Sequence, residues 1–334
     1  MKSLEYYWYH ANVFVWFLLP LSWLYCFVSY TRRTLYQLNI KKSFAATAPV
    51  VVIGNIVVGG SGKTPLLIAL CEYLQEKGYK PGVVSRGYGG DVDGVKPVLS
   101  TDSASRVGDE PLMIRLRTQV PVIVGVDRVA AINYLLANNP CDIVLSDDGL
   151  QHYRMQRDLE FAVIDASRKF GNGFCLPAGP LRERVSRLDD VDIVVYNGAV
   201  QSDADACAYD LKIVGVSKLD AGAASEEIVP LAAFADNEIH AVAGIGHPAR
   251  FFAQLGETIT TVSEHAFPDH HVYTQDDFSG WHQDCIIMTE KDAVKCRHLN
   301  LKDAWVLLVK AELSDALERQ LIEKLLPLLK HKTN

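Results

Sequence analysis

A glycine-rich segment between an apolar run and a helical pattern constrains the fold of this chain more than any other feature. Residues 50–53 are Val-Val-Val-Ile, which is typical of a buried strand, and residues 64–76 have the apolar spacing of an amphipathic helix. The residues just before the helix are Gly59, Gly60, Ser61, Gly62, Lys63 and Thr64. A strand that passes through glycines into a helix is typical of a P-loop, so the sequence predicts an α/β domain that binds a nucleoside triphosphate.

The residue types in this segment suit the binding of phosphate. Glycines allow backbone N–H groups to surround phosphate oxygens, and the helix N-terminus adds partial positive charge. Lys63 is expected to contact the β- and γ-phosphates, and the Thr64 hydroxyl is expected to bind Mg²⁺. Val57 stands where the common pattern G-x-x-x-x-G-K-S/T has its first glycine. A chance Gly/Ser turn is the alternative, and the flanking strand and helix argue against it.

A second apolar run ends in paired carboxylates. Residues 143–145 are Ile-Val-Leu, and Asp147 and Asp148 follow one residue later. An acidic residue at the carboxyl end of a parallel strand can hold the metal ion that accompanies nucleotide phosphates. We therefore expect Thr64, Asp147 and Asp148 to bind Mg²⁺. An Asp-Asp-Gly turn without a metal is the alternative, and it is favoured only if the P-loop is disregarded.

Short apolar runs alternate with amphipathic segments along the rest of the chain, which predicts an α/β fold with a mostly parallel sheet. Further strands are expected at residues 82–85, 120–124, 142–145, 161–164, 192–196, 211–214, 239–243, 258–262, 286–289 and 305–309, and further helices at 128–137, 248–255 and 313–329. A polar stretch at 201–208 marks a boundary. The expected organisation is an N-terminal membrane-anchoring segment (1–40), a P-loop domain (41–205), an extended connection (206–234) and a smaller α/β domain (235–334).

The N-terminus carries one long apolar segment. Residues 6–31 contain no Asp, Glu, Lys or Arg, and residues 13–28 are almost wholly apolar. Such a segment can span a bilayer or lie in its interface, and the basic residues that follow it keep the remainder in the cytoplasm. A cleaved signal peptide would instead carry its basic residues before the apolar segment. A buried helical hairpin broken at Pro20 is the other alternative.

Composition argues against several other functions. The formal net charge of -7 argues against broad binding to nucleic acid. The chain has 7 cysteines, an odd number without a C-x-x-C pair, which fits a reducing compartment better than a disulfide framework or a zinc cluster. Zinc at Asp269, His265, His270 and His271 is disfavoured because neither a cysteine nor a helical pair of histidines accompanies them.

A series of motifs resembles the tetraacyldisaccharide 4'-kinase family of lipid A synthesis, in that family's order. The motifs are residues 54–65 (GNIVVGGSGKTP), 85–90 (SRGYGG), 107–111 (VGDEP), 147–152 (DDGLQH), 176–183 (LPAGPLRE), 267–271 (FPDHH) and 289–292 (TEKD). The resemblance runs from the apolar N-terminus to at least Lys295. The family shares the unusual P-loop, so Val57 supports the assignment.

The resemblance implies a kinase that uses ATP and Mg²⁺ to phosphorylate the 4'-hydroxyl of a tetraacylated glucosamine disaccharide 1-phosphate. The enzyme would act at the cytoplasmic face of the bacterial inner membrane. Its expected partners are the lipid-linked disaccharide and the membrane surface, with no nucleic acid and no obligate protein partner. An N-terminal helix on the membrane would bring the enzyme to a substrate whose acyl chains stay in the bilayer.

The resemblance also assigns roles to individual residues. Asp109 is expected to be the catalytic base, assisted by His270 or His271, of which we favour His270. Gln151 and His152 would line the nucleotide site through their donor groups. The alternatives are that Asp109 caps a helix before Pro111 and that the histidines are surface residues.

Two arginines in glycine-rich or proline-rich loops complete the expected site. Arg86 and Arg182 would clamp the triphosphate or the 1-phosphate of the substrate, because guanidinium groups pair well with phosphate oxygens. Either arginine could instead be structural. Two other function classes stay open from the residues alone. One is an ATPase or GTPase acting on a protein partner, in which residues 289–292 would partly imitate the guanine-reading Asn-Lys-x-Asp. The other is a catalytically silent nucleotide-binding adaptor, which would not need Asp109.

Overall fold

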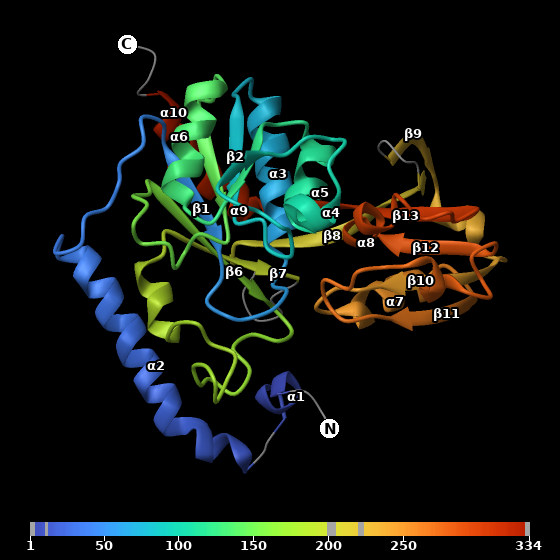
Figure 1. The fold of residues 1–334 in the computed structure, drawn as a ribbon, viewed down its shortest axis with the longest axis horizontal. Coiled ribbons are helices and arrows are strands. Elements are labelled where there is room, and N and C mark those ends of the chain that lie inside the picture. The colour runs from blue at the N-terminus through green and yellow to red at the C-terminus, as the bar shows by residue number, and fades with distance from the viewer. Residues whose placement is uncertain (1–3, 11–12, 199–204, 220–223, 331–334) are drawn as a thin grey trace. The chain divides into compact units, whose positions relative to one another are not determined.

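The structure is a computed structural model that describes residues 4–10, 13–198, 205–219 and 224–330. The chain divides into two compact units. Unit 1 comprises Met1–Val84, Arg128–Asp210 and Glu312–Asn334, and unit 2 comprises Ser85–Asp127 and Leu211–Ala311. Both units combine strands and helices, and Figure 1 colours their elements by position in the chain.

Unit 1 is built on parallel strands in the order β7-β6-β1-β5-β2. These strands are β1 (Val50–Gly54), β2 (Pro81–Ser85), β5 (Ile143–Asp147), β6 (Leu159–Asp165) and β7 (Ile193–Asn197). β1 lies between β5 and β6, and every residue of β1 is buried. This burial explains its unbroken Val/Ile sequence, because a strand covered on both faces has no solvent side that would need polar residues.

Helices flank this sheet (Figure 1). α3 (Lys63–Glu76) follows β1 and packs against β1 and β5. Its residues Leu66, Leu70 and Leu74 are fully buried at a spacing of four, as an amphipathic helix requires. The other helical elements of unit 1 are α1 (Leu4–Trp8), α2 (Phe14–Gln37), α6 (Arg128–Asn138), a 3₁₀ helix (Val185–Asp190), α9 (Asp315–Gln320), a π-helical turn (Leu321–Leu325) and α10 (Leu326–Lys330).

α2 has one face against unit 1 and one face exposed. Val15 and Leu19 are buried against Ala178, and Ser22 Oγ donates a hydrogen bond of 2.7 Å to the carbonyl of Cys175. Large apolar side chains on the remainder of the helix are exposed, with Phe17 at 79%. Pro20 lies within the helix and does not end it. Of the helices that the structure describes, none has the length and apolarity that crossing a membrane requires.

Unit 2 contains a parallel group of strands in the order β11-β10-β12-β13 and a separate antiparallel pair, β3 with β4. Its strands are β3 (Val95–Pro97), β4 (Val122–Gly125), β8 (Ala208–Leu219), β9 (Ala224–Val229), β10 (Glu238–Ala243), β11 (Thr261–Ala266), β12 (Cys285–Thr289) and β13 (Asp303–Leu313). The first residues of β8, up to Asp210, and the last residues of β13, from Glu312, belong to unit 1. Its helices are α4 (Ala104–Val107), α5 (Asp109–Thr118), α7 (Pro248–Gly256), α8 (Glu290–Cys296) and two 3₁₀ helices (Leu231–Phe234 and Gln275–Phe278). Apolar clusters around Phe251 and around Tyr273 form its core.

The α/β class and the mostly parallel sheet predicted from the sequence are confirmed. The compact units differ from the expected linear division, because residues 85–127 belong with the later part of the chain. The reason is that α5, which the sequence did not predict, packs against α8. The segment expected to be an extended connection, residues 206–234, includes β8 and β9, which pair antiparallel. Residues Glu312–Asn334 return to unit 1.

Candidate active site

The glycine-rich loop of unit 1 leads directly from β1 into α3. Gly59 and Gly62 have φ angles of +99° and +87°, in the region that glycine favours. A Cβ atom on Gly62 would collide with the side chains of Asn197 and Tyr209. α3 begins at Lys63, so the partially positive N-terminus of a helix follows the loop at once. The loop therefore fits the binding of phosphate, as its sequence predicts.

Side chains from distant segments hold this loop. Asn55 is fully buried, and its Nδ2 donates hydrogen bonds to Ser61 Oγ at 3.0 Å and to the Gly59 carbonyl at 3.4 Å. Asn197 Nδ2 donates to the Ser61 carbonyl at 3.2 Å, and the Tyr209 hydroxyl donates to the Gly62 carbonyl. The loop is thus held from β1, β7 and β8. Sequence reasoning missed all three supporting residues, although Asn55 lies within a recognised motif.

Asp148 lies between two cations after β5. Lys63 Nζ is 3.5 Å from Asp148 Oδ1, and Arg182 Nη1 donates to Oδ1 and Oδ2 at 3.0 and 2.8 Å. Burial alone would raise the pKa of the Asp148 carboxyl, but the two cations outweigh burial and lower that pKa to about 2. The structure therefore brings two of the predicted residues, Lys63 and Arg182, to the ionised carboxylate of a third, Asp148.

The proposed magnesium ligands are hard oxygen donors. Thr64 is buried at the start of α3, and Asp147 is buried at the end of β5. In the described part of the chain, no three His, Cys, Asp or Glu side chains are gathered in a way that could hold a metal ion. Mg²⁺ does not require such a cluster, because it commonly uses one or two carboxylates together with phosphate oxygens and water. The oxygens of Thr64, Asp147 and Asp148 therefore fit this ion.

Gln151 lies in a hydrogen-bonded network beside the loop. Its Nε2 donates to the Asn55 carbonyl at 3.1 Å and to Glu183 Oε2 at 3.0 Å, and the Tyr153 hydroxyl donates to the other oxygen of Glu183. The donor group of Gln151 is therefore engaged with the protein. His152, the next residue, is half-buried, and its carbonyl accepts a hydrogen bond of 2.7 Å from Arg157.

The proposed catalytic pair is in unit 2, and its two members are in contact. His270 Nδ1 lies 2.9 Å from Asp109 Oδ2 and 3.2 Å from Oδ1. Asp109 is the first residue of α5 and is only 4% exposed, and the N-cap position belongs to Gly108 rather than Asp109. His270 has a φ angle of +61°, and its ring lies edge-on to Tyr88 with centroids 4.9 Å apart. His271 instead places its Nε2 3.3 Å from Asp277.

The electrostatics of the pair favour an ionised carboxylate. Burial raises the pKa of the Asp109 carboxyl, but the hydrogen bond from His270 and the charge of Lys291 outweigh burial, so that pKa is lowered. The hydrogen bond to Asp109 raises the pKa of His270, although burial and Lys291 oppose this. Asp109 is therefore ionised at neutral pH, and the shared proton belongs to His270.

Lys291 is a cation beside this pair, and sequence reasoning gave it no role. Its Nζ lies 3.0 Å from Asp269 Oδ1, 3.1 Å from Glu110 Oε1 and 3.9 Å from Asp109 Oδ2. Burial lowers the pKa of Lys291, but the three carboxylates outweigh burial and raise it. The only available signal was its place in the motif at residues 289–292.

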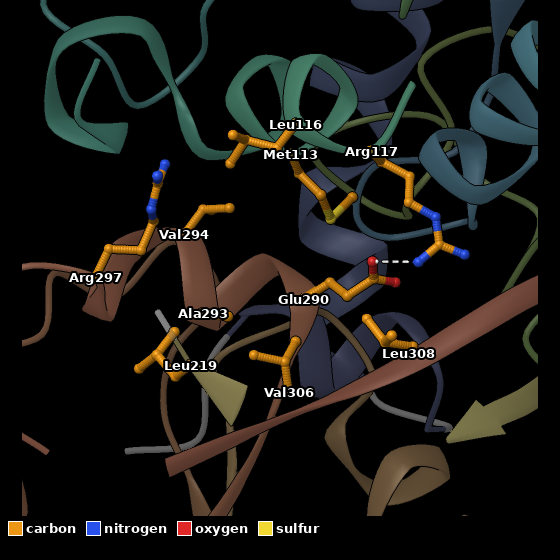
Figure 2. A pocket seen from close by; sticks show the side chains of 10 residues that line it. All are labelled: Met113, Leu116, Arg117, Leu219, Glu290, Ala293, Val294, Arg297, Val306 and Leu308. Atoms are coloured by element: carbon orange, nitrogen blue, oxygen red, sulfur yellow. Dashed lines mark hydrogen bonds and ion pairs between the residues drawn. The ribbon is translucent and has the colours of Figure 1, made fainter. Parts of the chain in front are cut away.

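A pocket of about 160 Å³ lies between α5, α8 and β13. Figure 2 shows the side chains that line it: Met113, Leu116, Arg117, Leu219, Glu290, Ala293, Val294, Arg297, Val306 and Leu308. Most of this lining is apolar. Arg117 Nη1 and Glu290 Oε1 form an ion pair of 2.9 Å, which the dashed line in Figure 2 marks. The pair joins the last turn of α5 to the first turn of α8.

Arg86 belongs to a different compact unit from Lys63 and Arg182. It follows β2, belongs to unit 2 and is exposed. Arg182 is half-buried and contacts Asp148. The two arginines expected to clamp phosphate therefore have different environments, and only Arg182 contacts another predicted site residue in the same unit.

A mostly parallel α/β sheet with a glycine-rich loop, a lysine and a threonine at the start of the following helix is typical of proteins that bind nucleotide phosphates. The sequence model of the family "Tetraacyldisaccharide-1-P 4'-kinase" matches residues 14–326. The chain belongs to this family and is an enzyme of the kinase class.

Individual relatives agree with this membership. The chain is 43% identical to a tetraacyldisaccharide 4'-kinase of Methylobacillus flagellatus over 98% of this chain and 97% of the relative. It is 45% identical to one of Shewanella baltica over 95% and 93%. The crystal structure of LpxK from Aquifex aeolicus in complex with ATP superposes with a TM-score of 0.79 at 26% identity, over 95% of this chain and 100% of that chain.

Proposed function

We propose that this enzyme transfers the γ-phosphoryl group of ATP to the 4'-hydroxyl of a tetraacylated glucosamine disaccharide 1-phosphate. Family membership and the relatives' names support the reaction. The observation that carries the mechanism is the contact between Asp109 and His270, because it provides a buried, oriented proton acceptor for a sugar hydroxyl.

The glycine-rich loop, proposed as a P-loop, provides the phosphate contacts. Its backbone and the N-terminus of α3 favour the negatively charged phosphates, and Lys63 adds a full positive charge. Asp148 holds Lys63 and Arg182 at one place in unit 1. Bound phosphates would then share with Asp148 the negative charge that balances these two cations. A bound Mg²⁺ held by Thr64, Asp147 and Asp148 would neutralise charge on the phosphate oxygens.

Asp109 accepts the proton of the attacking hydroxyl in the proposed mechanism. The hydroxyl oxygen forms a bond to the γ-phosphorus, and the bond from this phosphorus to the oxygen of the leaving ADP breaks. A carboxylate with a lowered pKa is a weak base by itself. Neutral His270 can hydrogen-bond to Asp109 and share the proton that Asp109 accepts. The pair is therefore ready to accept a proton when Asp109 is ionised and His270 is neutral.

We further propose that α2 attaches the enzyme to the inner membrane at its cytoplasmic face. Its buried face packs on unit 1 through Val15, Leu19 and Ser22, so the opposite face is left to solvent. That face exposes large apolar side chains: Val13, Trp16, Phe17, Leu21, Trp23, Leu24, Phe27, Val28 and Tyr30. An apolar helical face with aromatic residues, followed by basic residues, is suited to the membrane interface. Arg33 at its end pairs with Asp190 at 2.6 Å, which ties the helix to unit 1.

The reaction is tested with γ-labelled ATP and a tetraacyl-disaccharide 1-phosphate in detergent micelles. Wild type should produce labelled lipid, and Asp109→Asn should lose turnover while still binding ATP. Lys63→Met should weaken ATP binding itself, and Asp93→Asn, which changes an exposed carboxyl of unit 2, should leave both properties unchanged.

Two results would contradict the proposal. ATP hydrolysis without labelled lipid would favour an ATPase that acts on another partner. Near-normal transfer by Asp109→Asn would remove this residue from the role of base, even if the reaction itself is observed.

A further inference from the structure

Lys291 is surrounded by three acidic groups from two separate segments of unit 2. Asp109 and Glu110 belong to the first turn of α5, and Asp269 belongs to the loop that presents His270. Their oxygens lie 3.9, 3.1 and 3.0 Å from Lys291 Nζ. One ammonium group therefore connects the segment that carries the proposed base with the segment that carries its histidine.

The backbone at Lys291 is itself firmly held. Thr289 is the N-cap of α8, and its side chain accepts a hydrogen bond from the Asp292 N–H. Asp292 is fully buried, where its carboxylate accepts hydrogen bonds from the Gly244 N–H at 2.9 Å and the Tyr273 hydroxyl at 3.0 Å. Lys295 Nζ lies 2.7 Å from the same carboxylate. Because the first turn of α8 is fixed, the backbone of Lys291 has a defined position, and its side chain can hold the start of α5 in place.

α5 is also attached to α8 at its other end. The ion pair of Arg117 with Glu290 lies beside the pocket of Figure 2, one residue along the chain from Lys291. Glu290 and Lys291 thus bind opposite ends of α5 from one turn of α8. The orientation of Asp109 at the start of α5 consequently depends on α8, although α8 contributes no residue to the pair.

The charges give Lys291 a second effect. Without it, Asp109, Glu110 and Asp269 would repel one another at close range, and His270 would be the principal cation balancing them. The groups that surround the His270 ring are Asp109 from α5, Asp269 from its own loop, Lys291 from α8 and the Tyr88 ring. A positive Lys291 makes a second positive charge on His270 less favourable. It therefore favours the neutral imidazole that the proposed proton transfer needs.

We propose that Lys291 is a positioning residue of the phosphoryl transfer, which orients Asp109 and His270 and opposes a second positive charge on the His270 ring. The inference rests on the proposed role of Asp109 and His270. It assigns a function to the motif at residues 289–292 other than nucleotide recognition, because Asp292 is buried in structural hydrogen bonds.

The first test measures the titration of His270 by NMR, with isotope-labelled histidine and no substrate. The signal of His270 is identified as the one missing from His270→Gln. Lys291→Met should raise the pKa of His270 by about one unit, Lys291→Arg should keep it near the wild-type value, and Lys310→Met should leave it unchanged. Lys310 is exposed on β13 and serves as the control for loss of one positive charge.

The second test follows kcat/KM for phosphoryl transfer against pH. Below the pKa of His270, Lys291→Met should have about one tenth of the wild-type kcat/KM, because a shift of one unit leaves about one tenth as much neutral imidazole. Above both transitions the deficit of the variant should shrink to a smaller constant remainder that reflects lost orientation, and Lys291→Arg should retain the wild-type profile. A merely structural defect would lower activity equally at all pH values.

The outcomes separate this inference from the proposed function. If thermal unfolding shows that Lys291→Met is folded and the His270 titration is unchanged in this variant, the inference is wrong, whatever the activity. A uniform loss of kcat/KM without movement of the pH profile would also overturn it. Absence of labelled lipid from the wild type would overturn the proposed function, while the NMR titration would still report on Lys291.

Discussion

Arg182 donates hydrogen bonds from a single nitrogen to both oxygens of Asp148, at 3.0 and 2.8 Å. The pair lies beside Lys63, so Asp148 is ionised with a pKa of about 2. Two segments that the sequence separates by 34 residues are thus joined at the proposed nucleotide site by one carboxylate.

Arg182→Met should lower stability at neutral pH and weaken ATP binding. The pKa of Asp148 is lower in the folded protein than the value of about 3.9 in an unfolded chain, so the pair stabilises the fold above that pH. This contribution is lost as the pH falls through about 2. We expect the free energy of unfolding to decrease by about 1 kcal/mol at pH 6, because the pair is partly exposed.

Denaturant unfolding at pH 6 and near pH 2 measures this effect, and Arg184→Met is the control. Arg184 is an exposed neighbour of Arg182 in the same loop. A stability difference between wild type and Arg182→Met that is equal at both pH values would contradict the assigned ion pair.

Gly62→Ala should disable the loop for two reasons. The φ angle of +87° strains any residue with a Cβ, and here the added atom would collide with the Asn197 and Tyr209 side chains that hold the loop. Gly78→Ala is a matched control, because Gly78 has a φ of +83° with no heavy atom within 4 Å of the added Cβ. We expect calorimetry to show loss of ATP binding in Gly62→Ala alone, with both variants destabilised by about 1–2 kcal/mol or more. Normal binding by Gly62→Ala would show that the loop backbone does not contact phosphate.

The pH dependence of transfer should report the state of His270. Contact with Asp109 raises the pKa of His270 above 6.5, so we expect kcat/KM to rise with pH through a value above 6.5 as the imidazole becomes neutral. His270→Gln should lower kcat/KM and abolish this rise. A wild-type profile that is flat from pH 6 to 9 would exclude a titrating His270 from the mechanism.

The contact between Asp109 and His270 should stabilise the fold more at low pH than at high pH, whereas kcat/KM should rise with pH. The raised pKa of His270 means that its interaction with Asp109 stabilises the fold fully below the unfolded pKa of about 6.5, and the contribution is lost as the pH rises through the folded pKa. His270→Gln should therefore be less stable than wild type at pH 5.5 and closer to it at pH 9. Urea unfolding at both pH values measures the difference, which would be absent if the two side chains do not interact in solution.

Local chemistry made the loop and its flanking elements predictable from the sequence. Gly59 to Thr64 carry their signal within a few residues, and the buried strand β1 and helix α3 have the apolar spacing of their class. Asp147 and Asp148 were found in the same way, from an apolar run that ends in acids. The family's motifs then indicated Asp109 and His270, which are 161 residues apart in the chain yet in contact.

The supporting residues were not predictable because their partners are distant in sequence. Asn197 and Ser61 are separated by 136 residues, and Lys291 and Glu110 by 181. No periodicity connects such positions, since the contacts arise only when strands and helices pack. The helix α5 was missed for a related reason: it is short, begins after a glycine with a φ of +92° and is held by α8. Propensity within ten residues carries too little information to predict it.

The exposed face of α2 should determine membrane binding. Trp16 and Phe17 are 66% and 79% exposed, so replacing both with serine removes apolar surface that the fold does not bury. Each large apolar side chain gains about 1.5–3 kcal/mol on full burial, so even partial insertion predicts a decrease of about tenfold or more in partitioning to vesicles. Leu19→Ser is the matched contrast, because Leu19 is 8% exposed and packs on Ala178. That variant should lose stability, whereas the Trp16/Phe17 variant should unfold like the wild type and fail to float with vesicles that contain anionic phospholipid. Equal flotation of the Trp16/Phe17 variant and the wild type would mean that another surface attaches the enzyme to the membrane.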